Sequence, residues 1–397
     1  MNNFTESQER LELRKAVADL GKKYGRDYFE KAAKEGRKTT ELWQEAGKLG
    51  YLGVAVPEEF GGGGGDIGDL AAVCEELAAA GNPLLLMVVS PAIVGTIIAQ
   101  YGTQEQKERW LPGLADGSST FAFSITEPDA GSNSHKIITT AYRDADGWRL
   151  KGTKTYISGV DEASHVLVVA RTEDARTVPP SPDGLGGTPH LKPALFLVPT
   201  DSKGFTYNEI DMGIVSPEKQ FTLFFDDVLV PADALIGSED AGIEQLFAGL
   251  NPERIMGASF ATGTARLALA KATEYAKERQ VWKAPIGSHQ AIAHPLAESF
   301  IEIEMARLMT QKAAALYVSG DFMAAGEAAN MAKYAAGEAV CNAVDRAIQT
   351  HGGNGLANEY GLVQMLAGSR LSRIAPVSRE MVLNFIAQFS LGLPKSY

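Results

Sequence analysis

A carboxylate with potential for acid–base chemistry stands in the sequence Asn251-Pro252-Glu253-Arg254. A positioned carboxylate can remove a weakly acidic proton as a general base. A structural interpretation competes with this one, because Asn is a favoured N-cap, Pro suits the first helical position and Glu is stabilised in the first turn of a helix. From these residues alone, capping is favoured over catalysis for Glu253.

Four other strings hold residues that could bind a ligand. Thr126-Glu127-Pro128-Asp129-Ala130-Gly131-Ser132 and Lys151-Gly152-Thr153-Lys154-Thr155-Tyr156-Ile157-Ser158 do not suit a packed core. The Arg279 guanidinium could bind two oxygens of a diphosphate, or could simply lie near the dipole of a helix C-terminus. The glycines of Gln349-Thr350-His351-Gly352-Gly353-Asn354-Gly355 could let the backbone approach a nucleotide, although a bare glycine-rich turn means little.

Taken in the order in which they occur along the chain, these strings resemble motifs of the acyl-CoA dehydrogenase family of flavoenzymes. Further matches at Pro57-Glu58-Glu59-Phe60-Gly61-Gly62 and Phe225-Asp226-Asp227-Val228-Leu229-Val230-Pro231 extend the resemblance over nearly the whole chain. It implies FAD as cofactor, an acyl-CoA as substrate and an electron-transfer flavoprotein as the electron acceptor. It also implies an α+β fold of three domains: an N-terminal helical bundle at 1–120, a small β-barrel or sandwich-like domain at 121–232 and a C-terminal four-helix bundle at 233–397.

The resemblance assigns roles to individual residues. It places flavin contacts at Phe123, Ile125, Thr126, Ser132, Tyr156, Ser158, Arg279, Trp282, Gln290, Gln349, Gly352, Gly353, Ser378 and Glu380. It places substrate contacts at Ser132, Asn251 and Arg254. Because the Arg279 segment and the Gly352-Gly353 loop would complete the flavin site of a neighbouring subunit, it implies a homotetramer built as a dimer of dimers. His351 stands where relatives often carry an apolar residue, and we expect a loop histidine without a catalytic role.

The resemblance also reverses the preference for capping at Glu253. Relatives carry the base that removes the α-proton of the thioester at one of two positions, and the commoner one is occupied here by Pro376, which cannot accept a proton. The other position, used by isovaleryl-CoA dehydrogenases and members acting on branched or longer chains, matches Glu253-Arg254. We therefore expect Glu253 to be the base, the flavin N5 to accept hydride from the β-carbon and the product to be the trans-2-enoyl-CoA.

Two questions about the chemistry stay open at this stage. A helix N-terminus would lower the pKa of Glu253, whereas burial under an acyl chain would raise it. In the family, the backbone N–H at the position of Pro376 donates to the thioester oxygen, and proline has no N–H. Loss of one such donor costs about 2.7 to 4 kcal/mol of transition-state stabilisation.

Composition limits the class of protein. A chain of 397 residues with 45% hydrophobic content can bury a large core, and its net charge of −12 argues against nucleic-acid binding. Cys74 and Cys341 are expected to be reduced core residues in a cytoplasmic protein. The apolar run Leu84–Ile98 is broken by Pro91 and too short for a bilayer, so we expect a buried helix near an acyl pocket. The spacing of the six histidines predicts no metal site.

Hydrophobic periodicity predicts the elements that position these residues. The pattern is helical from Ser7 to about Leu114, consists of short β-branched and aromatic stretches from about Phe121 to Pro231, and is helical again from about Ile243 to Gly392. Thr177–Pro193 is expected to be an exposed loop.

Two rival functions remain open. A same-fold flavin oxidase or monooxygenase is one, because Pro376 removes a donor that the dehydrogenase reaction uses. A catalytically silent flavin- or acyl-CoA-binding subunit of a hetero-oligomer is the other.

Overall fold

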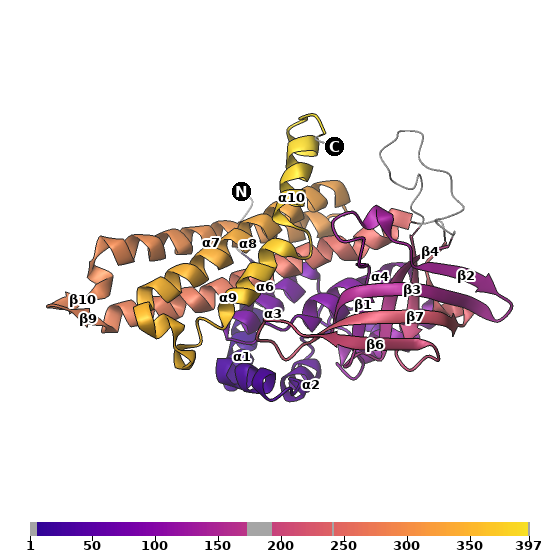
Figure 1. The fold of residues 1–397 in the computed structure, drawn as a ribbon, viewed down its shortest axis with the longest axis horizontal. Coiled ribbons are helices and arrows are strands. Elements are labelled where there is room, and N and C mark those ends of the chain that lie inside the picture. The colour runs from indigo at the N-terminus through magenta and orange to yellow at the C-terminus, as the bar shows by residue number, and fades with distance from the viewer. Residues whose placement is uncertain (1–5, 173–192, 240–241, 396–397) are drawn as a thin grey trace.

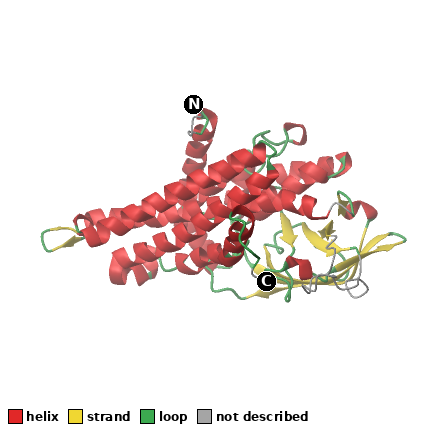
Figure 2. Cartoon of the chain, turned by 90° about the horizontal axis from the view of Figure 1, so that it is seen from above, coloured by secondary structure: helices red, strands yellow, loops and turns green. Residues whose placement is uncertain are grey.

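Helices form both ends of the chain and strands form its middle. The computed structural model describes residues 6–172, 193–239 and 242–395, with the side chains at 242 and 243 excepted. In Figure 1 the long helices run towards one end of the molecule and the sheet lies at the other. Figure 2, a perpendicular view, shows the same separation of helices and strands. The predicted α+β fold class is confirmed.

Among the described residues, five α-helices precede the sheet. They are α1 (Gln8–Lys34), α2 (Thr40–Lys48), α3 (Ile67–Ala79), α4 (Thr96–Tyr101) and α5 (Gln104–Ala115). The start of α5 follows local chemistry, because the Thr103 hydroxyl accepts from the Gln106 N–H and the Gln106 side chain accepts from the Thr103 N–H. Between α3 and α4, the π-helical segment Val88–Gly95 is entirely buried around Pro91. The apolar run is thus buried, as predicted.

No helix among residues 6–172, 193–239 and 242–395 combines the length and apolarity that crossing a bilayer requires. Cys74 and Cys341 are both free and buried, in agreement with the expectation of reduced core residues. The expected loop Thr177–Pro193 lies outside the described residues, apart from Pro193, which begins a strand.

An eight-stranded sheet forms the middle of the described chain. Its strands are β1 (Phe121–Ser124), β2 (Thr140–Asp144), β3 (Gly147–Ser158), β4 (His165–Arg171), β5 (Pro193–Pro199), β6 (Phe205–Ile210), β7 (Gln220–Val230) and β8 (Leu235–Ile236). The order is β6-β7-β3-β2-β4-β5-β8, and β1 pairs with β4 in parallel. Strand β4 is almost wholly buried, which accounts for its continuous apolar sequence. The β3–β7 pairing is irregular between Lys154 and Ile157, so the backbone departs from a regular ladder at Tyr156.

Long helices follow the sheet. They are α6 (Gly242–Glu278), α7 (Gln290–Val318), α8 (Phe322–His351), α9 (Met365–Ile374) and α10 (Arg379–Phe385), with the hairpin β9 (Gln280–Val281) and β10 (Ala284–Pro285) between α6 and α7. Small side chains let α6 and α8 approach closely, and the buried ones are Ala258, Ala261, Ala265, Ala268 and Ala272 on α6 and Ala332, Ala336, Ala339, Ala343 and Ala347 on α8. Glu253 precedes this interface, in the N-terminal half of α6.

Candidate active site

Glu253 lies inside α6 and not at a helix start, which corrects the interpretation of Asn251-Pro252 as an N-terminal signal. The helix begins at Gly242, so Asn251 is not an N-cap and Pro252 is an internal helical residue. The local preference was overridden because tertiary contacts satisfy the backbone group that a proline leaves unpaired.

A hydroxyl from another helix takes the place of the N–H that Pro252 lacks. In a regular α-helix the N–H of residue 252 would donate to the carbonyl of Ala248. Here the Tyr317 hydroxyl, on α7, donates to that carbonyl at 2.9 Å. The Gln100 amide, on α4, donates in turn to the Tyr317 hydroxyl at 2.9 Å. Three helices therefore meet one turn before Glu253 and support α6 through the proline.

Burial controls the acidity of Glu253. Its carboxyl is withdrawn from water, which raises its pKa to about 7, while the positive charges of Arg254 and Lys333 act in the opposite direction. The helix dipole is not available to lower the pKa, because it acts within the first turn and Glu253 lies about three turns inside α6. Of the two effects that the sequence left open, burial prevails. A carboxyl with this pKa can accept a proton near neutral pH.

Arg254 is buried beside this carboxyl, with 9% of its surface exposed. Its Nη1 donates to the Leu250 carbonyl at 3.0 Å and to Asn251 Oδ1 at 3.3 Å. Its Nε has no hydrogen-bond partner within the described residues. Burial lowers the pKa of Arg254, and Glu253 opposes that shift. A buried guanidinium with an unpaired N–H is able to bind an oxygen acceptor of a ligand.

The segment that contains Pro376 lies against α6 one turn after Glu253. A Cβ atom added at Gly257 would be 3.5 Å from Cδ of Pro376, which is van der Waals contact. The two positions at which relatives carry the base, Glu253 and Pro376 in this chain, are therefore close in space. Beyond Pro376, the Ser378 hydroxyl caps α10 by accepting from the Met381 N–H at 3.3 Å, and the side chain of Glu380 is 72% exposed.

Lys333 is a site residue that the sequence reasoning missed. It lies on α8 with 3% of its surface exposed, and its ammonium donates to the Val377 carbonyl, next to Pro376. Burial lowers its pKa to about 8. The available signal was a single lysine in the alanine-rich stretch Ala328–Ala339, where the helix is otherwise almost free of charge.

A buried ion pair joins the two strings that the sequence singled out in the β domain. Lys154 is fully buried, and its Nζ donates to Glu127 Oε1 and to the Ile125 carbonyl, both at 2.9 Å. Glu127 also accepts from the N–H of Thr139 at 2.9 Å. Burial lowers the pKa of Lys154 to about 8, and the Glu127 carboxylate opposes that shift. The Thr155 N–H donates to the Thr126 carbonyl at 3.0 Å, so the strings are tied side by side.

The predicted flavin contacts of the β domain lie on and beside β1 and β3. Tyr156 is 60% exposed and has a backbone φ of +56°, so its ring stands out of the sheet. Ser158 shares hydrogen bonds with Gln220 at 2.9 and 3.2 Å. Ser132 is exposed, whereas Phe123 is buried in the core. An exposed aromatic ring beside a hydroxyl fits a flat ring system such as the isoalloxazine of FAD.

Six of the remaining predicted flavin contacts gather around the β9–β10 hairpin, whereas Ser378 and Glu380 lie at the start of α10. Arg279 and Gln290 are exposed on either side of the β9–β10 hairpin, and Trp282 within it is 87% exposed. Figure 1 places this hairpin far from the sheet. The Arg279 segment and the predicted Gly352-Gly353 loop come together there, because Tyr275 near the end of α6 contacts both segments.

The contacts of Tyr275 are specific. Its ring stacks on His351 with 4.1 Å between ring centroids, its hydroxyl accepts from the Asn354 amide at 3.1 Å, and its carbonyl accepts from the Arg279 N–H at 2.8 Å. His351 is buried at the end of α8 and is not in the loop, which corrects the expectation of a loop histidine. Gln349 is exposed on the last turn of α8, and Gly352 and Gly353 are exposed just beyond it.

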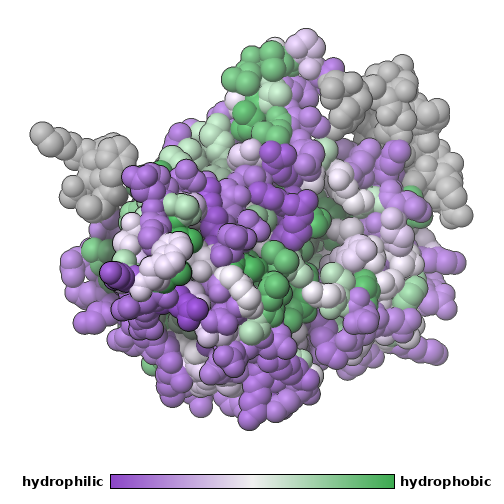
Figure 3. Space-filling view, turned by 60° about the vertical axis from the view of Figure 1, so that its left-hand side comes forward, coloured by the Kyte–Doolittle hydropathy of each residue, from purple (hydrophilic) through white to green (hydrophobic). Residues whose placement is uncertain are grey.

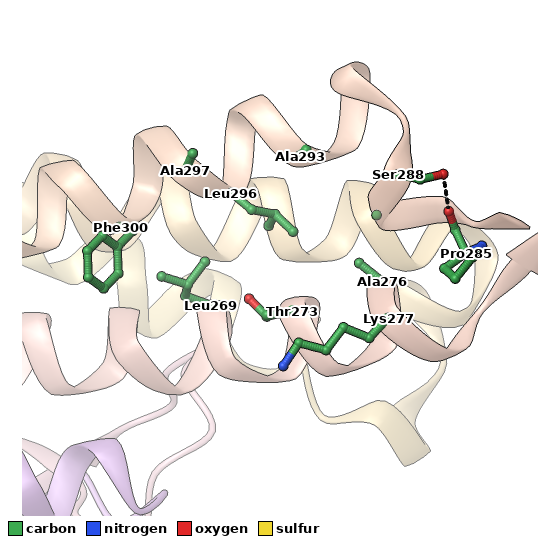
Figure 4. Close-up of a pocket in the computed structure, with 11 residues that line it drawn as sticks. Leu269, Thr273, Ala276, Lys277, Pro285, Ser288, Ala293, Leu296, Ala297 and Phe300 are labelled. Atoms are coloured by element: carbon green, nitrogen blue, oxygen red, sulfur yellow. Dashed lines mark hydrogen bonds between the residues drawn. The ribbon is translucent and has the colours of Figure 1, made fainter.

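A cavity of about 510 Å³ opens between α6 and α7 beside this hairpin. Figure 4 shows its walls, with Leu269 and Lys277 from α6 facing Leu296 and Phe300 from α7. The hairpin segment closes one end through Pro285, whose carbonyl accepts from the Ser288 hydroxyl at 2.7 Å. The cavity is therefore mostly apolar and lies at a distance from Glu253.

Comparison with known proteins adds independent findings. The sequence models of the acyl-CoA dehydrogenase N-terminal, middle and C-terminal domains match residues 7–118, 122–228 and 240–391. The chain is 62% identical over 395 residues to the acyl-CoA dehydrogenase FadE12 of Mycobacterium tuberculosis, covering 100% of this chain and 99% of that protein. The butyryl-CoA dehydrogenase of Megasphaera elsdenii has a similar structure, with a TM-score of 0.87 and 28% identity over 96% and 97% of the two chains. A glutaryl-CoA dehydrogenase of Mycobacterium smegmatis in complex with FADH2 has a TM-score of 0.87 and 26% identity over 99% and 96%.

Proposed function

The chain belongs to the acyl-CoA dehydrogenase family, and from that premise we propose that Glu253 is the base that removes the α-proton of a saturated acyl-CoA on the way to the trans-2-enoyl-CoA. The protein is a flavin-dependent enzyme whose cofactor is FAD. When bound, FAD supplies the acceptor for the hydride that leaves the β-carbon. The observation that carries the proposal is a carboxyl on α6 whose burial raises its pKa to about 7, which suits proton abstraction near neutral pH.

The surroundings of Glu253 support this role. Pro376 cannot act as a base, and it lies against α6 at Gly257, one helical turn after Glu253. The buried guanidinium of Arg254 offers a free Nε–H for a substrate oxygen. Exclusion of water by the bundle strengthens these charge interactions, because the local dielectric is low. We propose Ser132, Asn251 and Arg254 as the substrate-side residues.

We further propose that two subunits build each flavin site and that the enzyme is a homotetramer. Tyr156 belongs to β3 of the sheet, whereas Arg279 and Trp282 belong to the hairpin that Figure 1 places far from the sheet, which supports a cofactor site shared between two copies of the chain. Large apolar side chains are exposed near the C-terminus, where Phe389 and Leu391 are 66% and 67% exposed. Figure 3 shows hydrophobic atoms gathered on that protruding segment, and such faces are typical of subunit contacts.

Two further expectations complete the proposal. An electron-transfer flavoprotein would accept the electrons, as the family resemblance implies. The division into domains at 1–120, 121–232 and 233–397 stays a prediction, and β1, which begins at Phe121, is the element on which its first boundary depends.

The first test is anaerobic bleaching of the bound flavin by a panel of straight, branched and aromatic acyl-CoAs. We expect the wild-type enzyme to bleach with at least one thioester, and Glu253→Gln to bind that thioester while its flavin stays oxidised. Glu244→Gln is the matched control, because it makes the same change at an exposed position of the same helix and should bleach normally.

Each other outcome has a distinct meaning. If Glu253→Gln bleaches as fast as the wild type, Glu253 is not the base. If the wild type bleaches with no thioester, the dehydrogenation proposal fails in favour of a silent subunit that depends on a partner. Rapid reoxidation by oxygen after bleaching would instead point to an oxidase.

A further inference from the structure

We propose that Lys333 is a positioning residue of the dehydrogenation site, which anchors the Pro376-Val377 segment beside α6 and provides the positive charge that keeps Glu253 ready to accept a proton. The inference rests on the proposed role of Glu253 as the base.

The geometry begins with the contact of Lys333. The residue lies within α8, and its ammonium, almost completely buried, donates to the Val377 carbonyl. The preceding residue, Pro376, contacts α6 at Gly257, one helical turn after Glu253. Lys333 therefore connects three parts of the site: the bundle interior, the segment between α9 and α10, and the turn of α6 that follows the carboxylate.

This anchor matters because of the proline. Pro376 has no N–H with which to fix its own position through a main-chain hydrogen bond. The bond that the next carbonyl accepts from Lys333 holds the segment from the side of the bundle. Removing the ammonium would leave the Val377 carbonyl without this donor in a partly buried environment, and such a loss is costly.

The charges around Lys333 give it a second effect. The charges that act on it are those of Glu253 and Arg254 on α6, Glu338 on α8 and Glu380 on α10. Burial and the Arg254 charge lower the pKa of Lys333 and the three carboxylates oppose them, with a net pKa of about 8. Lys333 is thus mostly protonated at neutral pH, and its charge lowers the pKa of Glu253 against the effect of burial.

The experiment compares the pH dependence of flavin reduction by an acyl-CoA that bleaches the wild-type enzyme, with acyl-CoA affinity measured in parallel. In the wild type, the rate of flavin reduction should rise with pH as Glu253 ionises, and we call this part of the profile the rising limb. Lys333→Met should move the rising limb to a pH about one unit higher, which is the low end of the pKa shift that a nearby opposite charge causes. At pH 7 the variant should therefore reduce its flavin roughly fivefold more slowly. Lys333→Arg, which keeps the charge, should restore the position of the limb. Affinity for the acyl-CoA should change less than the rate.

Lys271→Met is the matched control. Lys271 also donates to a backbone carbonyl of the bundle, that of Tyr360 at 3.0 Å, but it lies about 27 Å along α6 from Glu253. This variant should leave the limb in place. If Lys333→Met does not fold, Lys333→Gln removes the charge while keeping a donor for the Val377 carbonyl, and the same shift is expected of it.

Two results together would overturn the inference. The rising limb would disappear in Glu253→Gln, which confirms that it reports this carboxyl, and it would stay at the wild-type pH in a folded variant in which Lys333 is replaced by an uncharged residue. A limb that persists in Glu253→Gln would contradict the assignment of the base itself. The two failures are therefore distinguishable.

Discussion

At the scale of single residues, the chemistry depends on where charge is buried. Glu253 and Lys333 are both withdrawn from water, and burial moves their pKa values towards each other, to about 7 and about 8. The carboxyl is thereby a stronger base than an exposed glutamate, and the ammonium is still charged when the carboxyl ionises. These shifts come from the environment, since either residue on the surface would titrate near its ordinary value.

The raised pKa of Glu253 predicts the direction of the pH dependence. The base must be ionised to accept the α-proton, so the rate of flavin reduction should rise with pH through an apparent pKa near 7 and level off above it. Rapid mixing of the enzyme with acyl-CoA, at pH values between about 5.5 and about 8.5, would show this rise in the rate of flavin reduction. A rate that falls across the same interval would exclude Glu253 as the ionising base.

At the scale of elements, the continuity of α6 depends on a contact from another helix. Pro252 has no N–H to donate to the Ala248 carbonyl, and the Tyr317 hydroxyl donates to that carbonyl in its place. Tyr317 is buried, and burial raises its pKa to about 12, so the hydroxyl stays protonated and able to donate. The position of Glu253 is therefore set by helix packing and by the sequence of α6 together.

Replacing this hydroxyl should weaken both the fold and the reaction. Tyr317→Phe removes the donor to the Ala248 carbonyl and should lower the free energy of unfolding by about 1 to 3 kcal/mol. Denaturant unfolding measures this change, and slower flavin reduction at unchanged acyl-CoA affinity would report a displaced Glu253. Tyr207→Phe, at a partly exposed tyrosine of β6, should change the unfolding free energy by no more than about 0.5 kcal/mol. Equal effects of the two changes would refute the support attributed to Tyr317.

At the scale of the whole molecule, most of the predicted flavin contacts belong to two separate sets, one in the sheet and one around the β9–β10 hairpin. Tyr156 and Ser158 belong to the sheet, and Arg279 and Trp282 to the hairpin at the far end of the bundle (Figure 1). A cofactor that needs both sets must therefore lie between two copies of the chain. On the proposed assignment of these contacts, flavin binding would depend on the assembly of subunits.

Mixed assemblies provide a direct test. In a dimer that pairs a Tyr156→Ala chain with an Arg279→Gln chain, one flavin site would carry both changes and the other would carry neither. We give each chain a different affinity tag and purify the dimers that carry both tags. These mixed dimers should regain half of the wild-type flavin content, whereas each variant alone should bind little flavin. Pairing a wild-type chain with a chain carrying both changes puts one change in each site and should give no recovery. The reverse pattern, with half of the flavin recovered in the pairing of wild-type and doubly changed chains and none in the other, would show that each site is built within one chain.

The sequence by itself determined the architecture and the identity of most candidate residues. The alternation of helical, β and helical patterns is local, because it follows from the spacing of apolar side chains along the chain. The strings around Thr126, Tyr156 and Arg279 carried the family resemblance without any knowledge of contacts. Glu253 could be selected because a proline at position 376 excludes the alternative base, and that exclusion requires only the residue type.

Only the tertiary structure decided the environment of those residues. Asn251-Pro252 has the local features of a helix start, yet α6 runs through it because Tyr317, 65 residues later, supplies the missing donor. Whether burial or the helix dipole controls the pKa of Glu253 depended on where α6 begins. The role of Lys333 depended on its meeting Val377, 44 residues away along the chain. Hydrogen bonding and desolvation act through space, so residues distant in the sequence determine them.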